Sequence, residues 1–480
     1  MYRKTYVALA YLGLLLGTAG CDTFLTGDKL STNPNLPTAA SIQQLFVGVQ
    51  AGQFAFEEGT VAMMMCQWVQ ACSATNGRFV QNAAQYNFGE GSNIAANGGD
   101  WISVYDGGGL VDIKQVEADA AATGDSSWLG IAKIWEAFTM GTASAMWGDI
   151  PYSQAISSNT SPALDNRFVI LGNLQTVLTD AIAELTNGSG AGPGVADLVF
   201  GVDTAFRHKW IKVAWTLKAR YYIETAESLG AAAYNNAITA ATNGISDASG
   251  ASDFRSFHST ATSERNMWAQ FQTSSGFGSD LEAGKAMTDY MNARGDPRRA
   301  QYFCPNKGGG YGGDDFNTAV PADSISNFLC LPPRFHADAR VPYVTYVENE
   351  LILAEAYNQT GNDALALTHL NNARATVGAP ISTPLVGIVG AALLDSIMLE
   401  KWVSSFQNME SISDYRRTCI PALTPSTNSF NFTHVPGRLY YPQNERNVNT
   451  NVPDASTQLA THGFRNAGDV HACQGSDNLP

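Results

Sequence analysis

The chain has 480 residues, 45% of them hydrophobic and 15% charged, and its formal net charge is −15. This composition excludes wholesale disorder, and a chain of this length buries enough surface to fold without a stabilising metal. The excess of 43 Asp+Glu over 28 Lys+Arg argues against binding to nucleic acid or to anionic lipid headgroups, because both repel an acidic protein.

The first 20 residues have the pattern of a signal peptide. Arg3 and Lys4 precede an uncharged run that ends at Leu16 and is too short to span a bilayer. Small residues then lead into Cys21, as at a bacterial lipoprotein cleavage site, although Thr18 stands where a larger aliphatic residue is usual. We expect a signal peptide over residues 1–20 and lipidation of Cys21, with ordinary secretion and a spare thiol as the alternative.

A polar segment with two prolines follows the cysteine. Residues 21–40 are therefore interpreted as the lipidated N-terminus and a tether, and residues 41–480 as one large folded body. The other six cysteines form an even set, which in an exported protein favours disulfides. We predict local pairing as Cys66–Cys72, Cys304–Cys330 and Cys419–Cys473. The first pair requires the helix around Met63–Trp68 to end before Cys72, because six residues of helix rise about 9 Å.

Helical periodicity dominates the body. Ser41 is a plausible N-cap for the first helix. The predicted helical segments are 42–56, 128–147, 173–185, 205–243, 345–377 and 390–409. The segment 128–147 is apolar on most faces, which indicates a buried helix. Strand signals are few and short, such as Leu439–Tyr441, and the long segments 73–100 and 304–344 are expected to be loops that are functional or carry extra structure.

Two of these segments resemble each other. Each is expected to be a pair of helices, broken near Gly230 in one and near Gly361 in the other, with small residues on the packing face of the second helix. This pattern is typical of a tetratricopeptide-type hairpin, in which small residues let two helices approach closely. Two unrelated amphipathic hairpins would show the same pattern. The fold class predicted from these features is mostly α, with helical hairpins packed into a single large body, long loops and few short strands.

The search for catalytic chemistry finds little. The seven histidines form no metal-binding spacing, and no nucleophile elbow or phosphate loop occurs. The glycines of GGGYGG match a dinucleotide fingerprint, but no predicted strand precedes them and no helix follows. Paired carboxylates occur at Glu57–Glu58 and Asp314–Asp315, and Glu348 and Glu355 share a helix face; solvated or capping roles are favoured for them over catalysis. No enzyme activity, cofactor or metal is therefore predicted, although the Asp314–Asp315 loop makes Ca²⁺ a candidate cation.

Aromatic residues in loops are the candidate ligand-binding groups, because sugar faces stack on Trp and Tyr. The candidates lie in or beside segments without strong periodicity: Tyr86, Trp101, Tyr105, Trp268 and Tyr311. Helix packing is the competing interpretation for Trp101 and Tyr105, which are four residues apart.

Several stretches together resemble the SusD/RagB family of nutrient-binding lipoproteins, in its SusD-like branch. They occur in the family's order and are MWGDIPYSQAI (146–156), NMWAQF (266–271), ARGDPRRAQYF (293–303), YVTYVENELILAEAY (343–357), EKWVSSFQNMESISDYRRTCIP (400–421) and GRLYYPQNERNVN (437–449). The resemblance implies four tetratricopeptide-like hairpins and architectural roles for the matched motifs. Asp149, Pro151 and Tyr152 would fix a loop after a buried helix, and Arg416 and Arg417 would pair with acidic groups or cap helix ends.

The resemblance also implies a function. The protein would be an outer-membrane lipoprotein, anchored through lipid at the cell surface, that binds oligosaccharide or peptide nutrients. It would deliver them to a partner TonB-dependent outer-membrane transporter of the SusC-like kind. A secreted all-α glycoside hydrolase and a helical-repeat scaffold that binds only protein are the alternatives. The family's ligand-binding aromatics vary between members, so the resemblance does not select among the candidates above.

Overall fold

The helical body begins at Ser41, which caps the first described helix as predicted. Its side chain accepts a hydrogen bond from the backbone of Gln44, whose own side chain accepts one from the Ser41 backbone N–H. This reciprocal capping box satisfies two backbone donors that a helix start would leave unpaired. The computed structural model describes residues 40–74, 79–80, 84–86, 99–274, 278, 280–428, 434–454 and 457.

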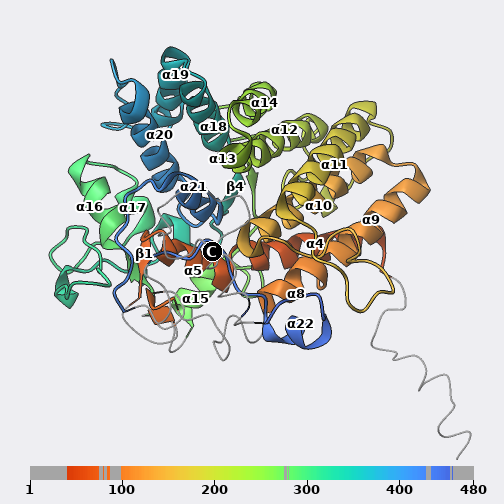
Figure 1. The fold of residues 1–480 in the computed structure, drawn as a ribbon, viewed down its shortest axis with the longest axis horizontal. Coiled ribbons are helices and arrows are strands. Elements are labelled where there is room, and N and C mark those ends of the chain that lie inside the picture. The colour runs from red at the N-terminus through yellow and green to blue at the C-terminus, as the bar shows by residue number, and fades with distance from the viewer. Residues whose placement is uncertain are drawn as a thin grey trace, which may run out of the picture.

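Helices make up most of the described chain (Figure 1). The α-helices are α4 (Ile42–Glu57), α5 (Thr60–Trp68), α8 (Gly99–Tyr105), α9 (Leu110–Thr123), α10 (Ser126–Trp147), α11 (Arg167–Asn187), α12 (Phe206–Glu224), α13 (Ala226–Leu229), α14 (Ala231–Thr242), α15 (Met267–Thr273), α16 (Lys285–Ala293), α17 (Arg299–Tyr302), α18 (Tyr346–Gln359), α19 (Asp363–Ala375), α20 (Gly390–Ser404), α21 (Glu410–Thr418) and α22 (Gln443–Val448). The short 3-10 helices are η2 (Gly194–Ala196), η3 (Ala322–Ser324) and η4 (Pro333–Phe335).

Eight helices form an arc over the rest of the molecule. In Figure 1 it runs from α9 at the right through α10, α11, α12, α14, α18 and α19 to α20 at the left, and neighbours along it pack together. α11 is long and apolar enough to cross a membrane, but here it packs between α10 and α12. The two predicted hairpins are α12–α14 and α18–α19, and they contact each other through α14 and α18. Hairpins far apart in the sequence are thus neighbours in one helical stack.

Small side chains make this contact possible, as predicted. Ala237 and Ala241 of α14 are buried against Ala219 of α12 and Ala356 of α18. Alanine at the contact lets helix backbones approach closely without loss of helix propensity. The helical fold class predicted from the sequence is confirmed.

Some predicted boundaries differ from the structure. The segment 205–243 breaks at Thr225 as well as at Gly230, so the short α13 separates α12 from α14. The helix predicted over 390–409 ends earlier, at Ser404, because the chain turns before α21 and Gln407 adopts a positive φ of 70°. Left-handed backbone of this kind cannot continue a right-handed helix.

The strands are few, as predicted, and lie in two small sheets. β1 (Cys72–Ser73) pairs antiparallel with β3 (Glu282–Ala283), and β2 (Phe254–Arg255) pairs antiparallel with β4 (Pro342–Val344). The strand predicted over Leu439–Tyr441 is wrong. Residues 439–441 are not in a strand; the segment lies beside the end of α10, where the Leu439 N–H donates to the carbonyl of Met146.

The core where these elements meet is aromatic. Trp135 and Phe138 of α10 pack against Phe254 of β2 with ring centroids 4.9 and 5.0 Å apart, and Tyr343 of β4 lies 5.4 Å from Phe254. Their rings meet mostly edge to face, an arrangement that adds to the free energy of apolar burial. The small β2–β4 sheet thus packs against α10 of the helical arc.

Two predicted disulfides are present. Cys66 bonds to Cys72, and α5 ends at Trp68, as this pairing requires. Cys304 bonds to Cys330 and closes a segment that carries η3 and the GGGYGG loop. Cys473 lies outside the described residues, so its pairing with Cys419 stays a prediction. The signal peptide, Cys21 and nearly all of the tether also lie outside them.

Candidate functional site

The five candidate aromatics lie in different environments. Tyr86 and Trp268 are core side chains, with 2% and 0% of their surface exposed. The Trp268 ring packs edge-on against Phe335, and the Tyr86 hydroxyl accepts a hydrogen bond from the backbone of Ser426. Neither ring lines any of the pockets described below, so neither is placed to bind a ligand.

Tyr311 is half-buried in the glycine-rich loop. The guanidinium of Arg299 lies 5.5 Å from the centre of its ring, and the Tyr311 carbonyl accepts a hydrogen bond from Asn292. One face of the ring is therefore covered by a cation of the protein itself. Tyr311 also lies apart from the pocket that contains the other two candidates.

Trp101 and Tyr105 line one open pocket of about 300 Å³. Three segments far apart in the sequence build it: α8, the loop that follows α10, and α22. Figure 1 shows α8 and α22 side by side at the lower edge of the molecule, away from the helical arc. Besides the two aromatics its lining residues are Ile102, Asp106, Pro151, Ala155, Asn159, Thr160, Pro162, Glu445 and Val448.

Trp101 forms the floor of this pocket. Its ring packs edge-on against Trp147 and Tyr441, at 5.3 and 5.9 Å, and only 3% of its surface is exposed. Its indole N–H donates to Oε2 of Glu445 over 3.3 Å. The Tyr105 ring lies 5.3 Å from the Trp101 ring, as expected for two side chains that pack on one helix. Both residues also line the pocket.

Tyr105 joins α8 to the loop after α10. Its hydroxyl donates to the carbonyl of Pro151 over 2.9 Å. Burial, and then the charges of Glu445 and other nearby groups, raise the pKa of Tyr105 well above its usual range, so the hydroxyl stays protonated and keeps donating at neutral pH.

The loop after α10 is held by the residues that the family resemblance marks as architectural. The Asp149 carboxylate accepts the backbone N–H of Arg167, and the Tyr152 hydroxyl donates to Glu136 over 2.8 Å. The Asp165 carboxylate accepts the backbone N–H groups of Tyr152 and Ser153, at 2.9 and 2.7 Å. These bonds fix the wall that carries Asn159 and Thr160.

α22 supplies the opposite wall, which sequence reasoning missed. Glu445 accepts hydrogen bonds from Trp101 and, through Oε1, from Asn449 over 3.0 Å. Asn449 also donates to the carbonyl of Pro162, so it links α22 to the loop after α10. The motif at 437–449 contains both residues, but nothing local in it indicates that they would meet Trp101.

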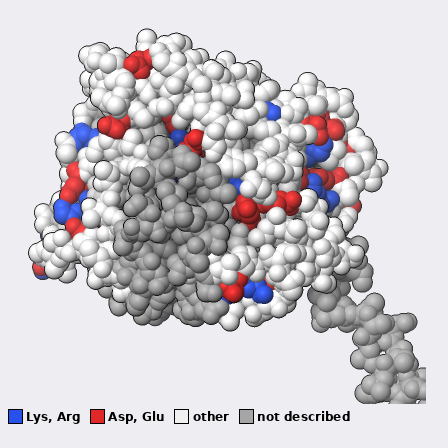
Figure 2. All heavy atoms as spheres, in the orientation of Figure 1, with Lys and Arg blue, Asp and Glu red and all other residues white. Residues whose placement is uncertain are grey.

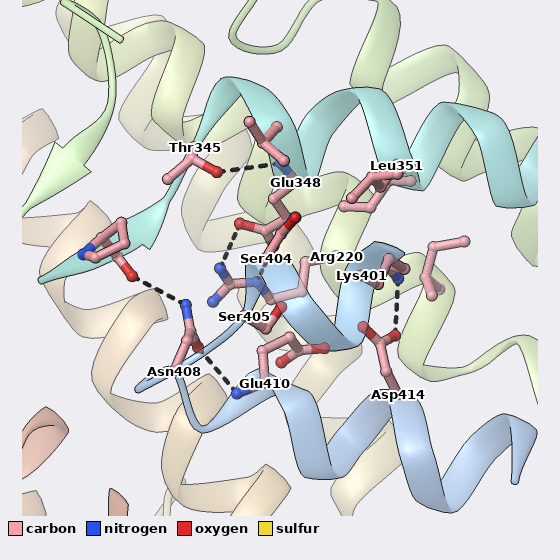
Figure 3. A pocket seen from close by; sticks show the side chains of 14 residues that line it. Arg220, Thr345, Glu348, Leu351, Lys401, Ser404, Ser405, Asn408, Glu410 and Asp414 are labelled. Atoms are coloured by element: carbon pink, nitrogen blue, oxygen red, sulfur yellow. Dashed lines mark hydrogen bonds and ion pairs between the residues drawn. The ribbon is translucent and has the colours of Figure 1, made fainter. Parts of the chain in front are cut away.

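A second, enclosed pocket lies between α12, α18, α20 and α21. In Figure 3 the side chains of Arg220, Glu348 and Glu410 converge on it. Its volume of about 30 Å³ holds about two water molecules, too little for a sugar. Arg220 donates to both carboxylate oxygens of Glu348, at 2.6 and 2.8 Å. The charged groups here join helices rather than face a substrate.

Two further carboxylates weighed for catalysis, Glu355 and Glu58, are also held by protein groups. Glu355 is fully buried and paired with Lys401 and Arg417, so the solvated or capping role expected for it is wrong. Glu58 accepts hydrogen bonds from Tyr343 and lies 2.9 Å from a ring nitrogen of His258. None of these groups is placed as two carboxyls facing one open site, which is the arrangement that glycoside hydrolysis needs.

The Asp314–Asp315 loop lines a third pocket of about 230 Å³. Asp314 accepts a hydrogen bond from Ser73 over 2.6 Å, and Asp315 accepts the backbone N–H of Asn317. Within the described ranges no group of three or more His, Cys, Asp or Glu side chains is arranged to hold a metal ion. Calcium binding at this loop stays a prediction.

Comparison with known proteins agrees with the fold. The sequence profile of the SusD-like family described as "Starch-binding associating with outer membrane" matches residues 34–442. A chitin-binding SusD homologue from Flavobacterium johnsoniae superimposes with a TM-score of 0.71 at 18% identity, covering 90% of this chain and 100% of that one. A SusD-like protein from Bacteroides thetaiotaomicron gives 0.71 at 20% identity, covering 91% and 100%.

A SusD homologue from Bacteroides fragilis gives a TM-score of 0.69 at 18% identity and covers 90% of this chain and 99% of that one. A search of curated proteins found no match. The profile spans most of the sequence, and the fold is similar to these structures over about nine-tenths of the chain. The chain belongs to the SusD-like family.

Proposed function

We propose that this protein is a lipid-anchored outer-membrane protein that binds oligosaccharides in the pocket of Trp101 and Tyr105 and delivers them to a partner TonB-dependent transporter. One observation carries the binding part: α8, the loop after α10 and α22 place aromatic, apolar and hydrogen-bonding side chains around one open pocket. Glycans need this combination, because their C–H faces are apolar and their hydroxyls require polar partners. Peptide nutrients are the second ligand class that such a pocket could take.

Family membership and two solved neighbours described as chitin-binding support a glycan ligand. Glu348 pairs with Arg220, and Glu355 pairs with Lys401 and Arg417; for these two carboxylates the pairing supports binding without turnover over the alternative of a glycoside hydrolase. Binding to a rigid, preformed surface requires no titrating group in the pocket.

Removing the pocket floor is expected to weaken glycan binding about tenfold. Trp101→Ala deletes the largest ring in the pocket, and a loss of about 1.4 kcal/mol corresponds to that factor. The measurement is calorimetric titration with chitohexaose and maltohexaose. Trp101 packs on Trp147, so its removal also affects the core. Ile102→Asn is therefore a second variant: Ile102 is 46% exposed, and its replacement should weaken glycan binding without opening the core. Tyr311→Ala, outside this pocket, should leave affinity unchanged; if it weakens binding instead, the glycan site lies at the Tyr311 loop.

Anchoring depends on Cys21 in this proposal. The wild-type protein is expected in the outer-membrane fraction and in the detergent phase of a phase separation, with a β-barrel transporter co-purifying. Cys21→Ser should move the protein to the aqueous phase, because two or more acyl chains hold a protein on a membrane and none remains in the variant. A wild-type protein without an acyl group would contradict the lipid anchor.

A further inference from the structure

The pocket of Trp101 and Tyr105 has acidic groups and, among its lining residues, neither lysine nor arginine. Asp106 is exposed at the end of α8 and Glu445 is half-buried on α22. The basic residue beside Glu445, Arg446, directs Nε to the carbonyl of Tyr441 over 3.1 Å and does not line the pocket.

The described residues around the pocket show no excess of positive charge. On the face drawn in Figure 2, Lys and Arg among the described residues occur in small groups mixed with acidic ones and form no broad basic patch. The whole chain is acidic, with a net charge of −15. A ligand with carboxylate or sulfate groups would therefore approach a repelling surface and find no cation inside the pocket to pair with.

The pocket also exposes apolar side chains. Ile102 and Val448 are 46% and 65% exposed, and Ala155 and Pro162 extend the apolar surface. Unsubstituted hexoses present C–H groups only on their ring faces, so they would leave part of this surface uncovered. A methyl group that covered it would contribute about fourfold in affinity. Asn159 and Thr160 lie beside the apolar wall. The Asn159 amide already donates to Gln154 and accepts the backbone N–H of Ser161, so it offers a ligand its second N–H, and Thr160 offers its hydroxyl.

We infer that this pocket takes uncharged sugars that bear an apolar substituent, acetamido sugars above all, and that Asp106 and Glu445 make it reject acidic glycans. An acetamido group combines a methyl, for the Ile102–Val448 wall, with an amide that can hydrogen-bond to Asn159 or Thr160. This inference rests on the proposed function and adds the chemical class of the ligand. Cations such as protonated amino sugars are tolerated, because the same acidic groups attract them.

The test is calorimetric titration of the mature protein at low salt with three hexasaccharides. Chitohexaose is neutral and carries acetamido groups, cellohexaose is neutral without them, and an oligogalacturonate is anionic. We expect chitohexaose to bind at least fourfold more tightly than cellohexaose and at least tenfold more tightly than oligogalacturonate. Raising the salt concentration should reduce only the difference in affinity between chitohexaose and oligogalacturonate, because only that difference is electrostatic.

Reversing the charge of Asp106 tests whether this residue makes the pocket reject acidic glycans. Asp106→Lys should raise the affinity for oligogalacturonate at least fivefold relative to the affinity for chitohexaose. The matched control is Asp395→Lys on α20, also exposed but on the arc away from the pocket. The control changes the net charge equally and should leave all three affinities within twofold.

The outcomes separate the inference from the function on which it rests. Equal binding of oligogalacturonate and chitohexaose, or equal effects of the two lysine variants, would overturn the charge selection while glycan binding stands. Equal binding of cellohexaose and chitohexaose would overturn the acetamido preference. If no hexasaccharide bound and an apolar peptide did, both the inference and the proposed glycan function would fall.

Discussion

Replacing Arg417 with methionine is expected to lower the free energy of unfolding by about 3–5 kcal/mol, the usual cost of removing one partner from a buried ion pair. Arg417 lies in α21 with 3% of its side chain exposed, and its guanidinium contacts Glu355 of α18 and Asp414. The variant would leave Glu355, which is fully buried, with one cation in place of two.

The cost is large because the four charges form a closed set. Lys401 of α20 donates to Glu355 over 2.9 Å and to Asp414 over 2.7 Å, and Arg417 contacts both carboxylates as well. Burial alone would raise the pKa of Asp414, but Lys401 and Arg417 outweigh it and hold the pKa below its usual value. The two carboxylates and two cations therefore form one set of ion pairs that joins α18, α20 and α21.

The measurement is denaturant unfolding followed by tryptophan fluorescence. Lys133→Met is the matched control: Lys133 lies 4.0 Å from Asp180, which is 58% exposed, so the expected change is within about 0.5 kcal/mol. A double variant, Glu355→Gln with Arg417→Met, removes one charge of each sign and should recover part of the loss. Equal effects of Arg417→Met and Lys133→Met would contradict the structural role of the set.

Replacing Glu57 with glutamine is expected to stabilise the protein by about 3 kcal/mol at pH 7. Glu57 is 4% exposed in α4, beside a cavity of about 10 Å³ between α4, α10, α12 and α21. Its Oε1 has no hydrogen-bond partner in the described part of the chain. Burial, which outweighs the hydrogen bond from Thr142 and the charge of Arg220, raises the pKa of Glu57 to about 8.

The folded state binds the Glu57 proton more tightly than the unfolded state does, and this decides how folding stability changes with pH. In the unfolded chain Glu57 ionises near its ordinary pKa of 4.5, whereas in the folded chain it keeps its proton until about pH 8. Folding stability is therefore lost progressively as the pH rises from about 4.5 to 8. Glutamine cannot ionise, so Glu57→Gln removes this loss and its advantage grows with pH.

Denaturant unfolding at pH 5, 7 and 8 tests this expectation. The gain should be below about 1 kcal/mol at pH 5 and about 3 kcal/mol at pH 7. Asp180→Asn, a surface carboxylate on α11, is the control and should show no comparable trend. A difference between Glu57→Gln and the wild type that did not change with pH would mean that Glu57 is ionised in the folded protein.

Signals within a few residues of each other were sufficient to predict most of the helices. The Ser41 cap, the buried helix at 128–147 and the break near Gly361 act through residues a few positions apart, and the structure shows all three. The motifs were sufficient for the family resemblance, because six modest matches in the family's order are together specific. The predicted end of the helix over 390–409 was wrong because the chain turns at Gln407, which has a positive φ. Nothing in the surrounding sequence requires left-handed backbone at that residue.

From the sequence alone, local periodicity and capping predicted the mostly helical fold, and the six ordered motifs carried the family resemblance. Local pairing was one of the fifteen arrangements that six cysteines allow, and the structure confirms Cys66–Cys72 and Cys304–Cys330. Only the tertiary structure decided which aromatics line a pocket: Trp268 is buried whereas Trp101 meets Glu445, 344 residues away. It also decided that Glu355 is buried, because its partners on α20 and α21 become neighbours only when the arc closes. Burial and pocket chemistry depend on contacts between distant segments, and no local pattern encodes those contacts.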